Sequence, residues 1–245
     1  MSYIEFNIVT IFPEMFKTPL NESILKKARE KKLLKIHLFD LRDFADGKHK
    51  VTDDYPYGGG SGMIMKPEPI VKAIESIKAE KPDSRVILMT PQGKTLNQDY
   101  ANTLSKEHSW IIVCGHYEGV DERVRQYFVD EEISIGDYIL TGGEIPAMVL
   151  IDVLARFIPG VIGGKNAIKN DSFINSLLEY PQYTRPATFR GLQVPEVLLS
   201  GNEKHIREWY HKQALKRTFE RRPDLLAKTE LKEEDKLYLE TIRKQ

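Results

Sequence analysis

The sequence WIIVCGHYEG (110–119) combines a β-rich run with a loop that is bounded by two glycines. Two other β-rich runs end in a similar way. RVILM (85–89) leads into TPQG (90–93), and a looser run around 132–135 leads into GDYILTGGE (136–144). In open α/β sheets, ligands bind beyond the carboxyl ends of the strands. The three loops therefore predict one binding site at a single edge of a sheet.

The rest of the first 160 residues also alternates β-rich runs with amphipathic stretches. Further strands are expected at 4–11 and 35–39. The helical stretches carry apolar residues at the spacing of one buried helix face, and they lie at 22–32, 69–78, 97–105, 121–128 and 146–158. Alternation of this kind favours an α/β fold, with a mostly parallel sheet flanked by helices.

The pattern changes after Pro159. Residues 161–170 are rich in glycine and polar side chains, which predicts a flexible linker between a domain at 1–160 and a second domain at 171–245. The second domain is predicted to be small and all-helical, with helices at 171–178, 195–198, 204–220 and 233–244.

The composition is typical of a globular protein, because 41% of the residues are hydrophobic and can form a core. Cys114 is the only cysteine, which excludes an intramolecular disulfide and a cysteine-based metal cage. The histidines show no metal-like spacing, so no protein metal site is predicted. The N-terminal MSYIEFNIVTIF is interpreted as a strand and not a signal peptide, and Asp152 and Arg156 interrupt the longest apolar stretch. We therefore expect a cytoplasmic protein that is not inserted in a membrane.

The formal net charge of zero hides a strong asymmetry along the chain. Residues 203–222 contain seven Lys or Arg and three Asp or Glu, whereas acids outnumber bases at 224–240. A basic helix of this kind suits the neutralisation of RNA phosphates, and the candidate residues are Arg207, Lys212, Lys216, Arg217 and Arg221. For the interleaved aromatic residues, such as Trp209 and Tyr210, packing in the core of the small domain is the simpler interpretation.

Several common catalytic motifs are absent. The sequence has no GxxxxGK[ST], HExxH or GxSxG pattern. The glycine-rich segment YGGGSG (57–62) does not match GxGxxG and leaves two interpretations open, a loop that contacts substrate or a simple turn.

Three loop motifs taken together point to one family: TPQGKTL (90–96), CGHYEGVDERV (114–124) and SIGDYILTGGEIPAM (134–148). They closely resemble the bacterial tRNA (guanine-N1)-methyltransferases of the knotted methyltransferase superfamily. The same family pattern continues, in order, in FPEMF (12–16), DDYPYGGGSGM (53–63), RFIPGV (156–161), NDSF (170–173), YPQYTRP (180–186) and VPEVLLSGN (194–202). Two positions differ from it, because His116 stands where an arginine is common and Gln182 where a histidine is common.

The resemblance implies a trefoil knot in the C-terminal part of the catalytic domain and S-adenosyl-L-methionine bound in that knot. It also implies a homodimer whose active sites are shared between subunits, the guanosine immediately 3′ of the anticodon in tRNA as substrate, and use of Mg²⁺. The cofactor-binding residues that it implies are Pro91, Gly115, Tyr117, Gly119, Ile135, Gly136, Asp137, Tyr138, Ile139, Leu140, Gly142 and Gly143. RNA contacts are also expected at Gly59, Gly60 and Arg185.

Methylation of a guanine ring nitrogen requires the loss of its proton, which calls for a general base and a nearby cation. By resemblance the base is Asp171, the cation is Arg156, and Glu118 holds the guanine amino edge. From the residues alone the simpler interpretations are favoured, with Asp171 as a helix N-cap and Arg156 paired with Asp152 one turn earlier, and only the motif context reverses this preference. Two other functions remain open, namely a ribose 2′-hydroxyl methyltransferase and a non-enzymatic RNA-binding protein. A third alternative, a nucleotide-binding regulatory protein, is not favoured, because the sequence contains no phosphate-binding motif.

Overall fold

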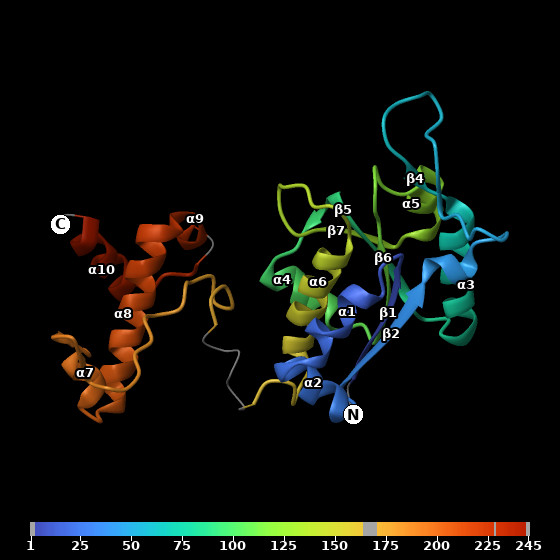
Figure 1. Cartoon of the computed structure of the whole chain (residues 1–245). Coiled ribbons are helices and arrows are strands. Elements are labelled where there is room, and N and C mark those ends of the chain that lie inside the picture. Colours follow the sequence, from blue (N-terminus) through green and yellow to red (C-terminus); the bar gives the residue numbers. More distant parts are fainter. Residues whose placement is uncertain (1–2, 164–170, 228, 244–245) are drawn as a thin grey trace. The chain divides into compact units, whose positions relative to one another are not determined.

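The computed structural model describes residues 3–163, 171–227 and 229–243 (Figure 1). The chain divides into two compact units, Met1–Gly164 and Lys165–Gln245. Most of the predicted linker, 164–170, lies outside the described residues, so its flexibility stays a prediction.

The N-terminal unit is built on a parallel sheet, as the alternating pattern predicts. The strand order is β2-β1-β6-β5-β7. These strands are β1 (Ile4–Thr10), β2 (Leu34–Asp40), β5 (Arg85–Thr95), β6 (Ser109–Cys114) and β7 (Glu131–Ser134). Along β1, the buried side chains of Ile4, Phe6 and Ile8 enter one core and that of Val9 enters the other. This period of two is expected for a central strand covered on both faces.

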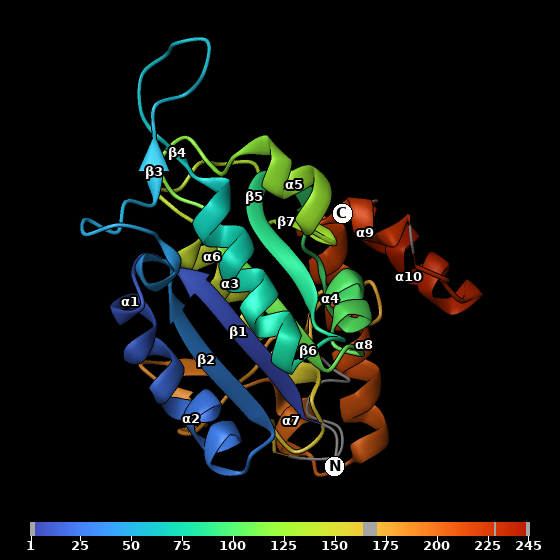
Figure 2. The ribbon, with the colours of Figure 1, turned by 90° about the vertical axis from the view of Figure 1, so that its right-hand side faces the viewer.

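Helices cover both faces of the sheet. They are α1 (Glu14–Lys17), α2 (Ser23–Glu30), α3 (Pro67–Glu80), α4 (Gln98–Leu104), α5 (Glu122–Phe128) and α6 (Glu144–Phe157). One core contains buried side chains of α1, α2, α4 and α6, and the other contains those of α3 and α5. Figure 2 shows α3 lying across one face of the sheet. Short 3-10 helices, Pro19–Asn21 and Leu41–Phe44, complete the connections.

The strand β5 is longer than the sequence predicts. The expected loop TPQG (90–93) forms part of the strand, which continues to Thr95. Met89 and Lys94 both pair with Ile133 of β7, so the strand bulges between them. A Cβ atom at Gly93 would overlap the backbone of Glu132, and this close approach requires glycine. The bulge directs Thr90–Gln92 away from the ladder, and the segment still acts as a loop at the sheet edge.

The C-terminal unit is not all-helical, which corrects the prediction. Its helices are α7 (Glu196–Leu199), α8 (Glu203–Arg221), α9 (Pro223–Leu226) and α10 (Glu233–Arg243). The unit also contains an antiparallel hairpin, which precedes α7 in the chain. It consists of β8 (Thr188–Phe189) and β9 (Leu192–Gln193) and turns through Arg190 and Gly191, both at positive φ. The long basic helix α8 begins at Glu203, close to the expected start at 204. The Asn202 side chain caps it by accepting a hydrogen bond from the His205 N–H.

The helix predicted at 171–178 is wrong, because this segment forms turns. Phe173 and Ser176 have positive φ, which is incompatible with an α-helix. The Phe173 N–H donates to the Leu177 carbonyl at 2.8 Å, and the Glu179 N–H donates to Ser172 Oγ at 3.0 Å. Serine hydroxyls compete in this way with helical hydrogen bonding. Asp171 is therefore not a helix N-cap.

Candidate active site

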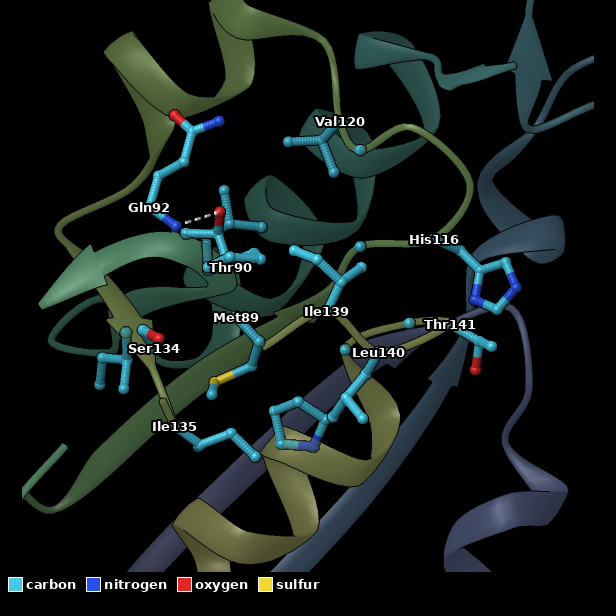
Figure 3. Close-up of a pocket in the computed structure, with 18 of the residues that line it drawn as sticks. Met89, Thr90, Gln92, His116, Val120, Ser134, Ile135, Ile139, Leu140 and Thr141 are labelled. Carbon is cyan, nitrogen blue, oxygen red and sulfur yellow. Dashed lines mark hydrogen bonds between the residues drawn. The ribbon is translucent and has the colours of Figure 1, made fainter. Parts of the chain in front are cut away.

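A cavity of about 640 Å³ lies at the carboxyl ends of β5, β6 and β7 (Figure 3). The three loops singled out in the sequence line it together with the strand ends. The predicted cofactor residues on its wall are Pro91, Gly115, Tyr117, Gly119, Ile135, Gly136, Tyr138, Ile139, Leu140, Gly142 and Gly143. Of the predicted set, Asp137 is the member that does not line the cavity. Figure 3 shows Met89, Ile139 and Leu140 around the same space.

The third loop, 134–143, passes directly against the second, 115–119. The Gly143 N–H donates to the Gly115 carbonyl at 2.7 Å, and Gly142 forms an antiparallel bridge with His116. A Cβ atom at Gly143 would lie 2.8 Å from Cys114 Cα, closer than real Cβ atoms approach. Glycine is therefore required here for the two backbones to touch, whether or not a ligand is bound.

Beneath this crossing lies a buried acidic side chain, Glu144, at the start of α6. Its Oε1 accepts a 2.8 Å hydrogen bond from Thr10 Oγ1, and its Oε2 lies 3.6 Å from His116 Nδ1. The His116 ring also makes an edge contact with Phe12, at 5.0 Å between centroids. Burial, with the Glu144 charge adding to it, raises the pKa of the Cys114 thiol well above its ordinary value. Cys114 is therefore an inert core residue.

One wall of the cavity is held by an arginine that sequence analysis missed. Arg125 of α5 donates from Nη1 to Gln92 Oε1 at 2.6 Å. Its Nη2 lies 2.8 Å from Glu132 Oε2, a distance that marks an ion pair although that oxygen lacks hydrogen-bond geometry. Glu122 lies 3.4 Å from Nη1. Only the Glu122–Arg125 spacing of three residues was visible in the sequence, and this is ordinary helix-surface pairing.

Glu118 connects the cavity with the glycine-rich segment 57–62. Its N–H donates to the Met63 carbonyl at 3.1 Å, and its carboxylate lies where a Cβ atom at Gly62 would be, 2.6 Å from Oε1. Gly62 has φ +90°, so it is constrained both by conformation and by contact. The loop above it is anchored by a short ribbon of β3 (Asp53–Asp54) and β4 (Ile64–Met65). Gly59 and Gly60 lie in this projecting loop (Figure 1).

The other predicted catalytic residues lie in different units. Arg156 is half-buried in the last turn of α6 in the N-terminal unit, whereas Asp171 belongs to the C-terminal unit. Asp171 begins the turn segment that Leu178 fixes to α8, where the Leu178 N–H donates to the buried Thr218 hydroxyl at 2.8 Å.

The predicted RNA-binding residues of α8 are partly engaged in local contacts. Arg207 pairs with Glu203 at 2.5 Å, Lys216 lies 3.9 Å from Glu220, and Arg217 donates to the Glu179 carbonyl at 3.1 Å. Lys212 and Arg221 of α8 are exposed, and so is Arg185, which precedes the hairpin in the chain. The aromatic side chains pack against one another, as the simpler interpretation holds. Among the residues that the structure describes, no group of three His, Cys, Asp or Glu side chains converges on a metal site.

Comparison with known proteins shows the family of this chain. The model of the family described as tRNA (guanine-1)-methyltransferase TrmD matches residues 4–228. A tRNA (guanine-N(1)-)-methyltransferase of Dictyoglomus turgidum is 57% identical over 242 residues, covering 99% of this chain and 98% of its own. The enzymes of that name from Geotalea uraniireducens and Geobacillus kaustophilus are 56% and 54% identical, and each alignment covers at least 98% of both chains. The chain therefore belongs to the tRNA (guanine-1)-methyltransferase TrmD family.

Proposed function

We propose that this protein transfers a methyl group from S-adenosyl-L-methionine to N1 of the guanosine immediately 3′ of the anticodon in tRNA. The observation that carries the proposal is the cavity at the carboxyl ends of β5–β7, in a chain of this family whose full-length relatives are named tRNA (guanine-N(1)-)-methyltransferase. The family favours methylation of a base over the ribose and over binding without catalysis.

The cavity suits a cofactor of this size and chemistry. Its volume of about 640 Å³ lies within the usual range for small-molecule sites. Backbone groups of Gly115, Gly119 and 135–140 would hold the adenine and ribose, with apolar contacts from Pro91 and Leu140. Gly119, at φ +121° and with open space around its Cβ position, supports a close approach of the ligand to the backbone. The cofactor supplies an electrophilic methyl group, so the chain itself must position the guanine and remove its proton.

We assign proton removal to Asp171, which would accept the N1 proton of guanine. A positioned general base contributes about 10²–10⁴-fold in rate. Arg156 would stabilise the negative charge that develops on O6, and Glu118 would accept a hydrogen bond from the 2-amino group. Glu118 lies on the cavity wall, which supports this part of the assignment.

We further propose that the active site combines the cavity of one subunit with Asp171 of its homodimeric partner. An exposed apolar face on α1 and α6 of the N-terminal unit supports association. Met15 is 40% exposed, Ile145 45% and Val149 38%, and apolar side chains exposed on neighbouring helices are typical of an interaction surface. The N-terminal unit would then bind the cofactor and the C-terminal unit the tRNA.

The same proposal includes the other properties that the family resemblance implies. A knotted path through the loops at 90–93, 115–119 and 134–143 is supported by the backbone contact at Gly143. Mg²⁺ use and a cytoplasmic location are proposed on the resemblance. None of the described helices has the length and apolar character that crossing a membrane requires.

The direct test is transfer of labelled methyl groups from S-adenosyl-L-methionine to unfractionated tRNA, followed by nucleoside identification. We expect 1-methylguanosine, and arrest of primer extension immediately 3′ of the anticodon. A 2′-O-methylated nucleoside, or the absence of transfer, would overturn the proposal.

A further inference from the structure

The imidazole ring of His116 lies at the wall that the 115–119 loop forms, but it is not directed at the cofactor cavity. Figure 3 shows the ring pointing away from Ile139, which lines the cavity. The ring makes edge contacts with Phe12 and Tyr117, each with 5.0 Å between centroids. These contacts hold it in one place on the outer side of the wall. Any effect of the ring on a bound ligand must therefore pass through another residue.

One ring nitrogen of His116 lacks the partner that its burial calls for. Nδ1 is buried and hydrogen-bonds to none of the residues that the structure describes. Glu144 Oε2 lies 3.6 Å from it, just beyond hydrogen-bond reach. A buried polar atom in this state costs free energy that a hydrogen bond would recover. The ring and the carboxylate are thus placed to interact without yet being bonded.

The Glu144 carboxylate is suited to receive a positive charge. The residue is 1% exposed, and its Oε1 accepts a hydrogen bond from the neutral Thr10 hydroxyl. It lies in the first turn of α6, where the helix dipole favours an ionised carboxylate. Carboxylates this deeply buried are normally paired with a cation. Protonation of His116 would supply that cation, because both ring nitrogens of an imidazolium are donors.

Other titratable side chains around the ring are those of Arg42, Cys114, Tyr117 and Glu118. The Arg42 guanidinium contacts the same Phe12 ring, 5.8 Å from its centroid. The Cys114 thiol stays neutral because burial raises its pKa. The Glu118 carboxylate lies against Gly62. Glu144 is thus the group through which a charge on the ring would act.

An ion pair at this point would fix the cavity wall. The two loops that meet here, 115–119 and 134–143, both line the cavity. His116 belongs to the first loop and bridges Gly142 of the second, and Glu144 follows directly after the second. Drawing the ring and the carboxylate together would hold the two loops against each other. A wall that is ordered in advance binds its ligand more tightly, because less ordering remains to be done on binding.

We propose that His116 is a positioning residue whose protonation pairs it with Glu144 and raises the affinity of the cavity for S-adenosyl-L-methionine. The inference rests on the proposed function, because it takes that cofactor as the ligand. Histidine is the side chain that ordinarily changes charge between pH 5 and 8. A proton that strengthens cofactor binding is itself bound more tightly when the cofactor is present. Cofactor binding should therefore take up a proton near neutral pH, and it should weaken as the pH rises.

The test is calorimetric titration of the full-length protein with S-adenosyl-L-methionine at pH 6 and pH 8. The amino group of the cofactor also titrates in this range, so each affinity is divided by that of His116→Arg, which stays charged throughout. We expect a ratio near one at pH 6. At pH 8 the wild type should bind about 10-fold more weakly than His116→Arg, as loss of a hydrogen bond to a charged group does. His116→Gln should bind weakly at both pH values.

Proton uptake gives a second readout that a purely structural role would not change. It is measured from the binding enthalpy in buffers of different ionisation enthalpy. The wild type should take up a proton on binding, and His116→Gln should not. His108→Gln is the matched control and should behave as the wild type, because His108 is exposed at the amino end of β6, whereas His116 follows the carboxyl end.

Glu144→Gln tests the partner, because its amide oxygen can still accept from Thr10 but carries no charge. In this background His116→Gln should cause no further loss of affinity at pH 6. Cofactor binding by the wild type without proton uptake, or with a ratio that does not change with pH, would overturn the role of His116 alone. If the cofactor does not bind at all, the proposed function fails. Coupling of the two substitutions in the melting temperature at pH 6, absent at pH 8, would then leave the protonation-dependent pair standing.

Discussion

The carboxylate of Glu144 lies 3.6 Å from His116 Nδ1, in the place that a side chain at Gly142 would need. A Cβ atom at Gly142 would overlap both His116 Nδ1 and Glu144 Oε2. The glycine is thus required by the protein's own packing, whether or not a ligand is bound. Because His116 belongs to the 115–119 loop, this packing also sets the position of a cavity wall.

Replacement of Gly142 by valine should therefore lower stability and abolish cofactor binding together. The overlap with a buried carboxylate should cost about 1–3 kcal/mol of unfolding free energy, as overpacking does. Thermal melting and calorimetry with S-adenosyl-L-methionine would measure the two effects. Gly163→Ala is the matched control, because its Cβ position is open. An unchanged melting temperature for Gly142→Val would show that the loop moves aside freely.

Arg125→Leu should weaken cofactor binding while the protein stays folded. Loss of the 2.6 Å hydrogen bond to Gln92 frees one wall of the cavity, and we expect about 10-fold lower affinity in calorimetry. Arg123→Leu is the control, because Arg123 pairs on the surface with Asp121 and does not line the cavity. In a Gln92→Ala background the effect of Arg125→Leu should largely disappear. If Arg125→Leu lowers cofactor affinity by the same factor in that background, the loss comes from the ion pair with Glu132 and not from the hydrogen bond to Gln92.

Asp171→Asn should fold, bind tRNA and S-adenosyl-L-methionine, and lose methyl transfer by about 10²–10⁴-fold, because an amide cannot accept the N1 proton. Since the structure places Asp171 in a turn, Asp171→Ala should not be destabilised through the loss of a helix cap. Single-turnover transfer to tRNA measures the effect. Near-normal turnover of the Asn variant would require another base, and Glu118 is the next candidate.

The basic face of α8 should make tRNA binding depend steeply on salt. Replacing Lys212 and Arg221 by glutamine should lower affinity and reduce the slope of log K against log salt by about 0.7 for each phosphate that is no longer neutralised. Lys26→Gln, on the exposed side of α2, should change neither quantity. A chain ending at residue 163 should bind cofactor but lose most tRNA affinity. If that shortened chain binds tRNA normally, the RNA site lies in the N-terminal unit.

If each site takes Asp171 from the partner subunit, two inactive variants should complement each other. In a mixed dimer of Arg156→Ala and Asp171→Ala, one of the two sites regains both residues. After complete subunit exchange about half of the dimers are mixed, so transfer should recover to about a quarter of the wild-type rate. The absence of any recovery would mean that both residues act from one chain.

The layered α/β fold, and the sheet edge at which the cavity lies, could be predicted from the sequence. β-rich runs such as Ile4–Thr10, which is buried along its whole length, and apolar faces on the intervening stretches are local patterns that leave little choice of architecture. The alternation of strands and helices predicts that the loops after the strands meet at one sheet edge. All of the predicted cofactor residues except Asp137 line one cavity there. The start of α8 was also predictable, because the Asn202 cap acts within a single turn.

The contacts between residues far apart in the sequence could not be predicted in this way. The extension of β5 depends on a bulge against β7, and the turn at 171–178 depends on hydrogen bonds to α8, 40 residues away at Thr218. The contacts of Arg125 with Gln92, and of Glu144 with His116, join segments whose spacing in the sequence carries no signal. Such contacts depend on where folded elements place their side chains, and local periodicity does not encode that information.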